Sequence, residues 1–349
     1  MLGTVSCRNK SGKGQGNLEL SARTAGHAVE LLPPGADKNN QSKWLDVRRK
    51  GVTASEIASI MGLSDKPSKF TLWWQKQGFL ESESNTRMAF GHFCEPFICQ
   101  QFAETHPEYL VLQVGLAAHS ERLWQMATCD RIAVSPDAAL NHVLTNPVPV
   151  EAKTSATFQD WGPEGTDIIP VNYRCQLMWQ MDVLGASYGY LSCLFLMTQE
   201  IRTYVVPYDS EDAVVMRAAA AVFRQSLDQG DEPPIDGSDS TTWALKSVYG
   251  DLEDVEQPLP RSLVNRYRSA VRRYDEADKR KKLVSNQIRA ALGNARRGVD
   301  IRTGERIVSR TRYARKAYTV KETTIDQLTP VRAKSATAAI DVTGSEDDG

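Results

Sequence analysis

A short apolar segment that ends in an acid and a lysine constrains the fold of this chain more than any other feature. Residues 148–154 read Val-Pro-Val-Glu-Ala-Lys-Thr, a pattern that predicts a β-strand. Glu151 and Lys153 are two residues apart, so a strand directs both side chains to the same face of its sheet. Taken alone, the pair is more readily explained as a surface ion pair, because short motifs recur by chance.

A second acid, Asp130, lies 21 residues before Glu151, within an apolar segment at 123–134 that is predicted to form one strand. A carboxylate in such a strand is costly unless it binds a metal or a partner. Asp130 and Glu151 could bind a divalent cation, with the backbone carbonyl of Ala152 as a third oxygen ligand. Lys153 could then hold or deprotonate the attacking water, or balance charge that develops on a phosphate. These are the parts that phosphodiester hydrolysis needs.

The order of the predicted elements is typical of an α/β protein with a mixed sheet. Thr53 and Glu56 have the spacing of a capping box, which predicts a short helix that Gly62 ends. Apolar residues at helical or alternating spacing predict the remaining elements. Helices are expected at 70–77, 85–105, 172–184 and 209–227, and strands at 109–117, 123–134, 148–154, 188–197 and 202–206.

Composition divides the chain into five segments. Gly, Ser, Pro and charged residues concentrate near both ends and again after residue 228, which is typical of segments without a packed core. We expect a disordered leader at 1–40, a core domain at 41–228, a linker with a short helix at 229–258, a basic helical arm with a hairpin at 259–334, and a disordered tail at 335–349.

The net charge of −1 conceals a strongly basic C-terminal quarter. Between Arg261 and Ser335 the chain has 21 lysines and arginines against 7 acidic residues. Such a segment suggests an anionic partner, although a solvated, charge-rich helix explains the charge nearly as well.

The cysteines indicate reduced thiols. None of them has the paired spacing of a metal or disulfide framework, so we expect buried thiols and no iron–sulfur cluster. No apolar run approaches the roughly 20 residues of a membrane span, and the start lacks a secretory signal, so we expect a cytoplasmic protein with no membrane partner. The cysteines are Cys7, Cys94, Cys99, Cys129, Cys175 and Cys193.

Asp130 followed by Glu151-Ala152-Lys153 resembles the PD-(D/E)xK nuclease signature. Within that superfamily, residues 44–207 resemble the YqaJ-like, lambda-exonuclease-type viral recombinases. Five landmarks occur in the family's order, which is harder to obtain by chance than any single motif. They are Arg48 with Thr53-Ala54-Ser55-Glu56, then Gly91-x-x-x-Glu95-Pro96, then Asp130, then Glu151 with Lys153, then Tyr173-x-x-Gln176-x-x-x-x-Met181.

The chain departs from the family at its acidic strand, where Cys129-Asp130-Arg131 replaces the frequent Pro-Asp-Gly. Asp137, in a Ser-Pro-Asp-Ala sequence, is an alternative for the same role. We favour Asp130, because it lies inside the predicted strand, whereas Asp137 lies at its exit.

The resemblance implies further site residues. Glu95 would complete the metal site or orient water, and Gln176 would orient Lys153 or the water. Arg48 and Ser55 would bind the 5′-phosphate of a DNA end. Each also has a structural explanation, as a helix acid, a surface amide or a residue at the start of a helix.

The resemblance implies a restriction-endonuclease-like α/β core, with a central mixed β-sheet flanked by helices, which would make 41–228 the nuclease domain and leave the basic arm beyond it. It also implies a metal-dependent DNA exonuclease, with Mg²⁺ or alternatively Mn²⁺, that digests duplex ends 5′→3′ and leaves 3′ single-stranded overhangs. Its partners in phage-type recombination would be a single-strand annealing protein and copies of itself, a trimer in the family precedent.

Three alternatives remain open on sequence alone. The first is another nuclease of the same fold, either an endonuclease or a 3′→5′ enzyme. The second is a non-catalytic DNA-binding recombination protein, against which the complete set of Asp130, Glu151 and Lys153 argues. The third is an interaction protein built on the basic arm.

Overall fold

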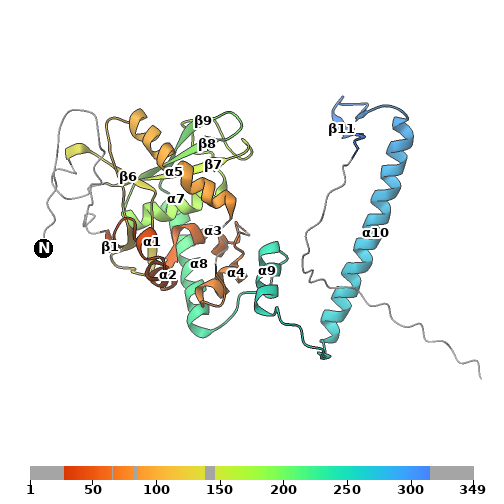
Figure 1. Ribbon diagram of the computed structural model, residues 1–349, viewed down its shortest axis with the longest axis horizontal. Helices are drawn as coiled ribbons and strands as arrows, with labels where there is room; N and C mark the ends of the chain where they lie inside the picture. Colours follow the sequence, from red (N-terminus) through yellow and green to blue (C-terminus); the bar gives the residue numbers. More distant parts are fainter. Residues whose placement is uncertain (1–26, 65, 82–84, 138–145, 315–349) are drawn as a thin grey trace, which may run out of the picture. The chain divides into compact units, whose positions relative to one another are not determined.

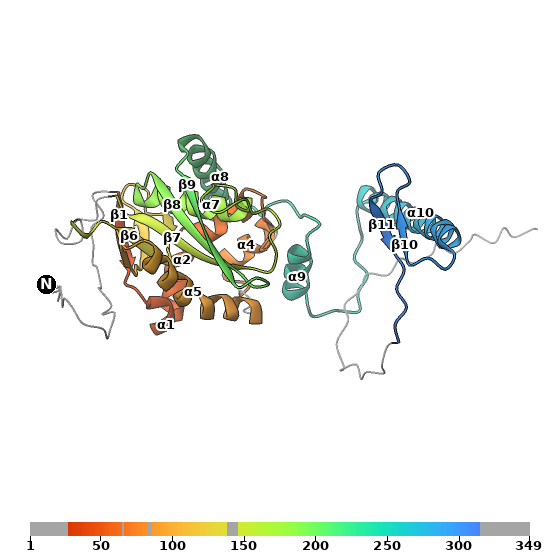
Figure 2. The same cartoon turned by 90° about the horizontal axis from the view of Figure 1, so that it is seen from above.

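The computed structural model describes residues 27–64, 66–81, 85–137 and 146–314 (Figures 1 and 2). The chain divides into two compact units, Met1–Gly250 and Asp251–Gly349. The first unit is an α/β domain, as predicted. Residues 1–26 of the expected leader and the expected tail at 335–349 lie outside the described residues.

A five-stranded mixed sheet organises the first unit. Its strand order is β3-β6-β7-β8-β9, and only β7 and β8 pair in parallel. The central strand β7 is the segment that the sequence singled out. The strands are β3 (Leu110–Leu112), β6 (Arg131–Val134), β7 (Val148–Ser155), β8 (Tyr188–Phe195) and β9 (Glu200–Pro207).

The two faces of this sheet are covered by different helices. Helix α5 (Thr86–Thr105) packs on one face, where Phe102 contacts Val148 and Val150 of β7. Helix α7 (Val171–Leu184) packs on the other face, and Figure 2 shows it there with α8 (Ser210–Gln229). Because side chains alternate along a strand, Glu151 and Lys153 of β7 face α7.

A second sheet of four strands corrects three expectations. Its order is β1-β4-β5-β2, formed by β1 (Ala28–Leu32), β4 (Leu116–His119), β5 (Gln125–Ala127) and β2 (Val52–Thr53). The leader therefore does not extend to residue 40, because β1 pairs with β4. The single strands expected at 109–117 and 123–134 are each two strands, since the chain passes from one sheet to the other within an unbroken apolar pattern.

The smaller elements follow their local signals. The short 3-10 helix η1 (Ala54–Glu56) and α3 (Ile57–Ile60) begin with the predicted capping box at Thr53, and Gly62 follows with a positive φ of 72°. The Asn85 side chain caps α5 by accepting from the Met88 N–H at 3.0 Å. The remaining helices of this unit are α1 (Ala36–Asn39), α2 (Gln41–Arg49), α4 (Lys69–Lys76) and α9 (Asp239–Val248).

The second unit consists of one long helix and a hairpin. Helix α10 (Arg261–Leu292) has no buried residue, and strands β10 (Arg297–Val299) and β11 (Arg306–Ser309) pair antiparallel. A hairpin was expected in this segment, and its turn contains Thr303-Gly304, where Gly304 takes the positive φ of 72° that favours glycine. Across the described ranges, no helix is both long enough and apolar enough to cross a membrane.

Candidate functional site

Glu151 is a buried carboxylate held by three side-chain donors. Its side chain is 3% exposed. Its Oε1 accepts from Lys153 Nζ and from Gln176 Nε2, each at 2.5 Å, and its Oε2 accepts from Gln180 Nε2 at 2.7 Å. Gln176 and Gln180 are four residues apart on α7, so both amides point from one helix face toward β7. This arrangement fixes the direction of the carboxylate.

Asp130 meets Glu151 from the segment between β5 and β6. Its Oδ2 accepts from the Ala152 N–H at 2.8 Å, so Asp130 and Glu151 lie on either side of the same β7 peptide. Burial, with the charge of Glu151 next in effect, raises the pKa of the Asp130 carboxyl well above its usual range. Asp130 does not lie inside a strand, as the sequence suggested. It lies between β5 and β6, where the chain leaves one sheet for the other.

Lys153 is the cation of this cluster. Burial lowers the pKa of its ammonium, but the carboxylates Glu151 and Asp130 together outweigh burial and leave that pKa above its ordinary value. The ammonium also lies 5.2 Å from the ring centroid of Tyr173. Lys153 therefore carries its proton here and supplies a positive charge beside two carboxylates.

Glu95 approaches the same cluster from α5. Glu95 lies 3.4 Å from Arg131 Nη1 and 3.9 Å from His92 Nδ1. Its charge adds to burial and the charge of Glu151 in raising the pKa of Asp130, whereas Lys153 lowers that pKa. Glu95 thus lies near the pair but is engaged by Arg131 rather than joined to Asp130.

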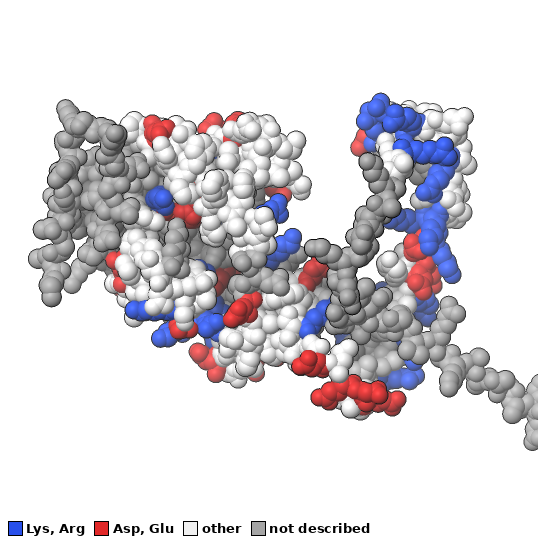
Figure 3. Space-filling view, in the orientation of Figure 1, with Lys and Arg blue, Asp and Glu red and all other residues white. Residues whose placement is uncertain are grey.

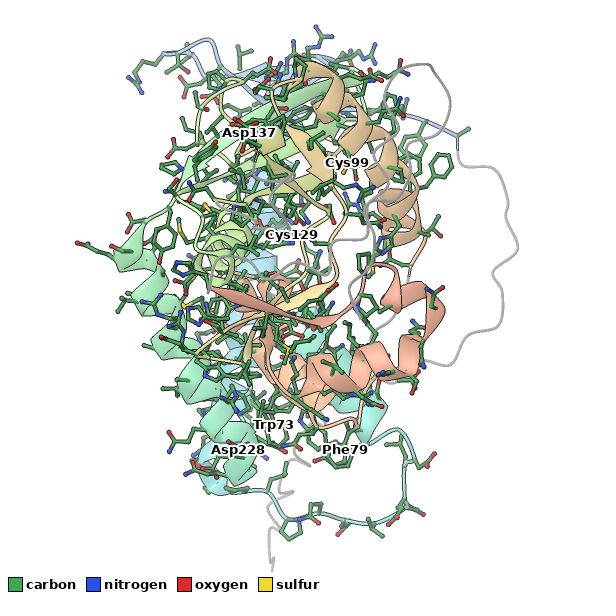
Figure 4. The ribbon with its side chains drawn as sticks, turned by 90° about the vertical axis from the view of Figure 1, so that its left-hand side faces the viewer. Trp73, Phe79, Cys99, Cys129, Asp137 and Asp228 are labelled. Atoms are coloured by element: carbon green, nitrogen blue, oxygen red, sulfur yellow. The ribbon has the colours of Figure 1, made fainter. Side chains whose placement is uncertain are left out.

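Asp137 is remote from this cluster. It is exposed and follows the end of β6, whereas Asp130 precedes the start of that strand. Figure 4 shows Asp137 apart from Cys129, the residue next to Asp130. The geometry therefore favours Asp130 of the two candidates.

Gln180 is a site residue that the sequence motif did not single out. Its Nε2 binds both Glu151 Oε2 and the Thr128 carbonyl, the latter at 3.1 Å. Among the described residues, Gln180 Oε1 and Thr128 Oγ1 are buried polar atoms with no hydrogen-bond partner. The four-residue spacing from Gln176 was the signal that could have identified Gln180, because it places both amides on one face.

These side chains fit a hard divalent cation. Asp130 and Glu151 supply carboxylate oxygens that repel one another, and the unpartnered Gln180 and Thr128 oxygens offer further polar contacts. Burial raises the pKa of the Cys99 thiol to about 12, and the charges of Asp130, Glu95 and Glu151 act in the same direction. Within the ranges that the structure describes, no three His, Cys, Asp or Glu side chains form a ready metal-ligand group, so the cation would draw on the backbone as well.

The described cysteines are buried free thiols, as predicted. They are Cys94, Cys99, Cys129, Cys175 and Cys193.

Arg48 and Ser55 form a second, separate cluster. Arg48 Nη2 donates to Thr53 Oγ1 at 3.0 Å and to Ser55 Oγ at 3.1 Å. The guanidinium also stacks over the Trp44 ring, with its carbon 4.2 Å from the ring centroid. Ser55 is exposed, so solvent can reach this cluster at the Ser55 hydroxyl, whereas Thr53 is buried. Helix α7 packs against both η1 and β7 and so links the two clusters.

Lys76 pairs with the Glu56 carboxylate, which lies next to Arg48. Its ammonium donates to the carbonyls of Arg48 and Gly51, each at 2.7 Å, and lies 2.8 Å from Glu56 Oε2. Glu56 is 3.8 Å from Arg48 Nη2, so one carboxylate stands between two cations. The sequence identified Glu56 only as a capping residue and missed Lys76, whose contacts are long-range.

We predict that Lys76→Met lowers the free energy of unfolding by about 3–5 kcal/mol, because a buried carboxylate loses its closest cation. Adding Glu56→Gln should recover part of that loss, since the amide keeps a hydrogen-bonding group at Thr53 without the buried charge. Chemical denaturation of the wild type, both single variants and the double variant gives the coupling energy. Strictly additive effects would contradict the charge balance.

Residues 43–187 match the model of the YqaJ-like viral recombinase domain. The chain is 24% identical over 280 residues to the uncharacterized protein YqaJ of Bacillus subtilis (strain 168), a match that covers 77% of this chain and 83% of that protein.

Two solved structures are similar over about half of this chain. The alkaline exonuclease from Laribacter hongkongensis is 18% identical, covers 54% of this chain and 93% of its own, and gives a TM-score of 0.43. The phage-related exonuclease from Haemophilus somnus 129PT is 12% identical, covers 51% of this chain and 94% of its own, and gives a TM-score of 0.38. The family match spans both clusters described above, from Arg48 through Gln180, so this part of the chain is similar to the YqaJ-like viral recombinase domain.

Proposed function

We propose that this protein is a metal-dependent DNA exonuclease that digests duplex ends 5′→3′ and leaves 3′ single-stranded overhangs for phage-type recombination. The observation that carries the proposal is the buried group around β7, in which Asp130 binds the β7 backbone from the segment between β5 and β6, while Lys153 of β7 and Gln176 of α7 bind Glu151. The recombinase family of residues 43–187 supports DNA as the substrate.

Asp130 and Glu151 would hold the divalent cation, Mg²⁺ or Mn²⁺, with the Ala152 carbonyl and Glu95 as further ligands. When bound, the cation supplies Lewis acidity toward a phosphate oxygen. The chain's own residues do the rest. Gln176 and Gln180 keep Glu151 directed at the site, and the Lys153 ammonium lies where it can offset negative charge on the phosphate under attack.

Arg48 and Ser55 would bind the terminal 5′-phosphate. A guanidinium is suited to phosphate because its N–H groups form a planar fork. Arg48 is already oriented by Trp44 and by two hydroxyls, and Lys76 takes up the Glu56 carboxylate that would otherwise compete with phosphate. This selectivity for an end carrying a 5′-phosphate supports the 5′→3′ polarity.

Two partners follow from the family alone. The overhang would pass to a single-strand annealing protein, and the enzyme would act as a homo-oligomer, for which a trimer is the precedent. Both are expectations that the residues on the two clusters do not test.

The direct test compares linear duplexes with 5′-phosphate or 5′-hydroxyl ends and a closed circle, each with Mg²⁺. We expect resection of the phosphorylated linear duplex and survival of the circle. Lys153→Ala should lower kcat by about 10²–10³-fold, since it removes a positioned cation from the reacting phosphate. Arg48→Gln should abolish the preference for a 5′-phosphate while leaving slow cleavage.

Other outcomes would identify a different protein. Cleavage of the circle would mean an endonuclease, and resection from the 3′ end would reverse the polarity. Binding of DNA without cleavage, in either Mg²⁺ or Mn²⁺, would mean a non-catalytic recombination protein.

We also predict that Gln180→Leu lowers kcat by about 10–100-fold with little change in KM, because Gln180 orients Glu151 without reaching the substrate. The matched control is Gln100→Leu, which removes an exposed amide that also binds a carboxylate, Glu104, on α5. Steady-state resection rates measure both. Equal effects of the two variants would refute a positioning role for Gln180.

A further inference from the structure

Helix α10 presents an unusual amount of uncompensated positive charge. All of its lysines and arginines are exposed, and Figure 3 shows them in blue along the helix. The basic residues are Arg261, Arg266, Arg268, Arg272, Arg273, Lys279, Arg280, Lys281, Lys282 and Arg289. The acids of the same helix are Asp275, Glu276 and Asp278.

The helix has two distinct sides. Its half-buried residues include a set that recurs every seven positions: Val264, Val271, Asp278, Ser285 and Leu292. A spacing of seven returns to nearly the same helix side, because an α-helix has about 3.6 residues per turn. This set marks a side of α10 that is less exposed than the rest of the helix.

A row of arginines occupies the opposite side. Arg266, Arg273 and Arg280 also recur every seven residues, two positions after the half-buried set, which places them about 200° around the helix from it. None of the three has a hydrogen bond or an ion pair with another described residue. They span about 21 Å of a continuous helix, since each residue adds about 1.5 Å.

Some cations of this unit have partners within it, whereas Arg268, Arg272, Lys279 and Lys281 of α10, like the row, have none among the described residues. Lys282 pairs with Asp278 at 2.5 Å, Arg289 donates to Asn286 Oδ1 at 3.1 Å, and Arg310 donates to the Gly293 carbonyl at 2.7 Å. These three cations already have partners within the unit. The arginine row therefore keeps its binding capacity for a molecule from outside.

The row suits the backbone of a duplex better than a single strand. Proteins that hold single strands stack bases on aromatic side chains. The tyrosines of α10, Tyr267 and Tyr274, are exposed, but each follows a row arginine by one residue and so lies about 100° away from the row. A straight row of guanidinium groups without aromatic residues binds phosphates and does not distinguish one base sequence from another.

We infer that Arg266, Arg273 and Arg280 bind the phosphate backbone of duplex DNA and give the protein a sequence-independent hold on its substrate. The choice of DNA as the anion rests on the proposed function. The hold itself is a property of the second unit and requires neither a DNA end nor a divalent cation.

The test measures duplex binding by the full-length protein without divalent cations, in the Lys153→Ala background, over a series of salt concentrations. One variant replaces the three row arginines with Gln. The matched control replaces Lys282, Arg289 and Arg310 with Gln, so both variants lose three positive charges from the same unit. A plot of the logarithm of the DNA-binding constant against the logarithm of the salt concentration has a negative slope. We expect the magnitude of that slope to decrease by about 3 in the row variant and by less than about 1 in the control.

Two results would overturn the inference. Equal slopes for the row variant and the control would show that only net charge matters. If the row variant changed the salt dependence of binding equally for a single strand of the same length, duplex DNA would be excluded as the specific partner of the row.

A cleavage assay separates this inference from the proposed function. With Lys153 intact, the row variant should show a raised KM for DNA and an unchanged kcat, because the row does not touch the reacting phosphate. A fall in kcat at unchanged KM would contradict the inference. If the wild type cleaves no DNA, the proposed exonuclease fails, whereas the slopes still decide whether the row binds duplex DNA.

Discussion

Burial of the Glu151 carboxylate dictates how the elements of the first unit meet. A buried carboxylate has to be matched by hydrogen-bond donors, and a single missing donor is expensive in the absence of water. Lys153 on the same strand and two glutamines on α7 provide that match. The register of α7 against β7 is therefore fixed by polar contacts, while the apolar residues around them, such as Leu177 and Leu191, seal the contact from solvent.

A second carboxylate next to the first creates an electrostatic conflict that the protein leaves unresolved. Asp130 shares the Ala152 peptide with Glu151, and burial beside that charge raises the pKa of Asp130. One lysine cannot neutralise both acids. The conflict is the feature that makes the pair suited to a divalent cation, and it contrasts with the Arg48 cluster, where Lys76 and Glu56 leave one cation available for a phosphate.

The sequence predicted which side chains lie close together around Glu151 better than it predicted the paths of the strands. β7 and α7 were expected nearly to the residue, because their apolar spacing is regular and their ends carry clear signals. Asp130 lies near Glu151, but it does not lie inside a strand as expected, since the apolar pattern continues while the chain changes sheets. β1 was missed because its pairing with β4 joins residues about 90 positions apart, which local composition does not reveal.

The polar residues that contact Glu151 and Glu56 also differ in how readily the sequence revealed them. Gln176 was found through its family motif, whereas Gln180 required the helix face to be considered as a unit. Lys76 had no local signal at all, because it contacts residues 20 or more positions away.

We expect Asp130 and Glu151 to form a cation site. Mn²⁺ binding, measured from the electron paramagnetic resonance signal of the free ion, tests this site without DNA. The wild type should bind Mn²⁺, and the Asp130→Asn variant should bind it with at least about tenfold lower affinity. The Asp137→Asn variant should bind Mn²⁺ with the affinity of the wild type. Loss of binding in Asp137→Asn but not in Asp130→Asn would contradict the site described here.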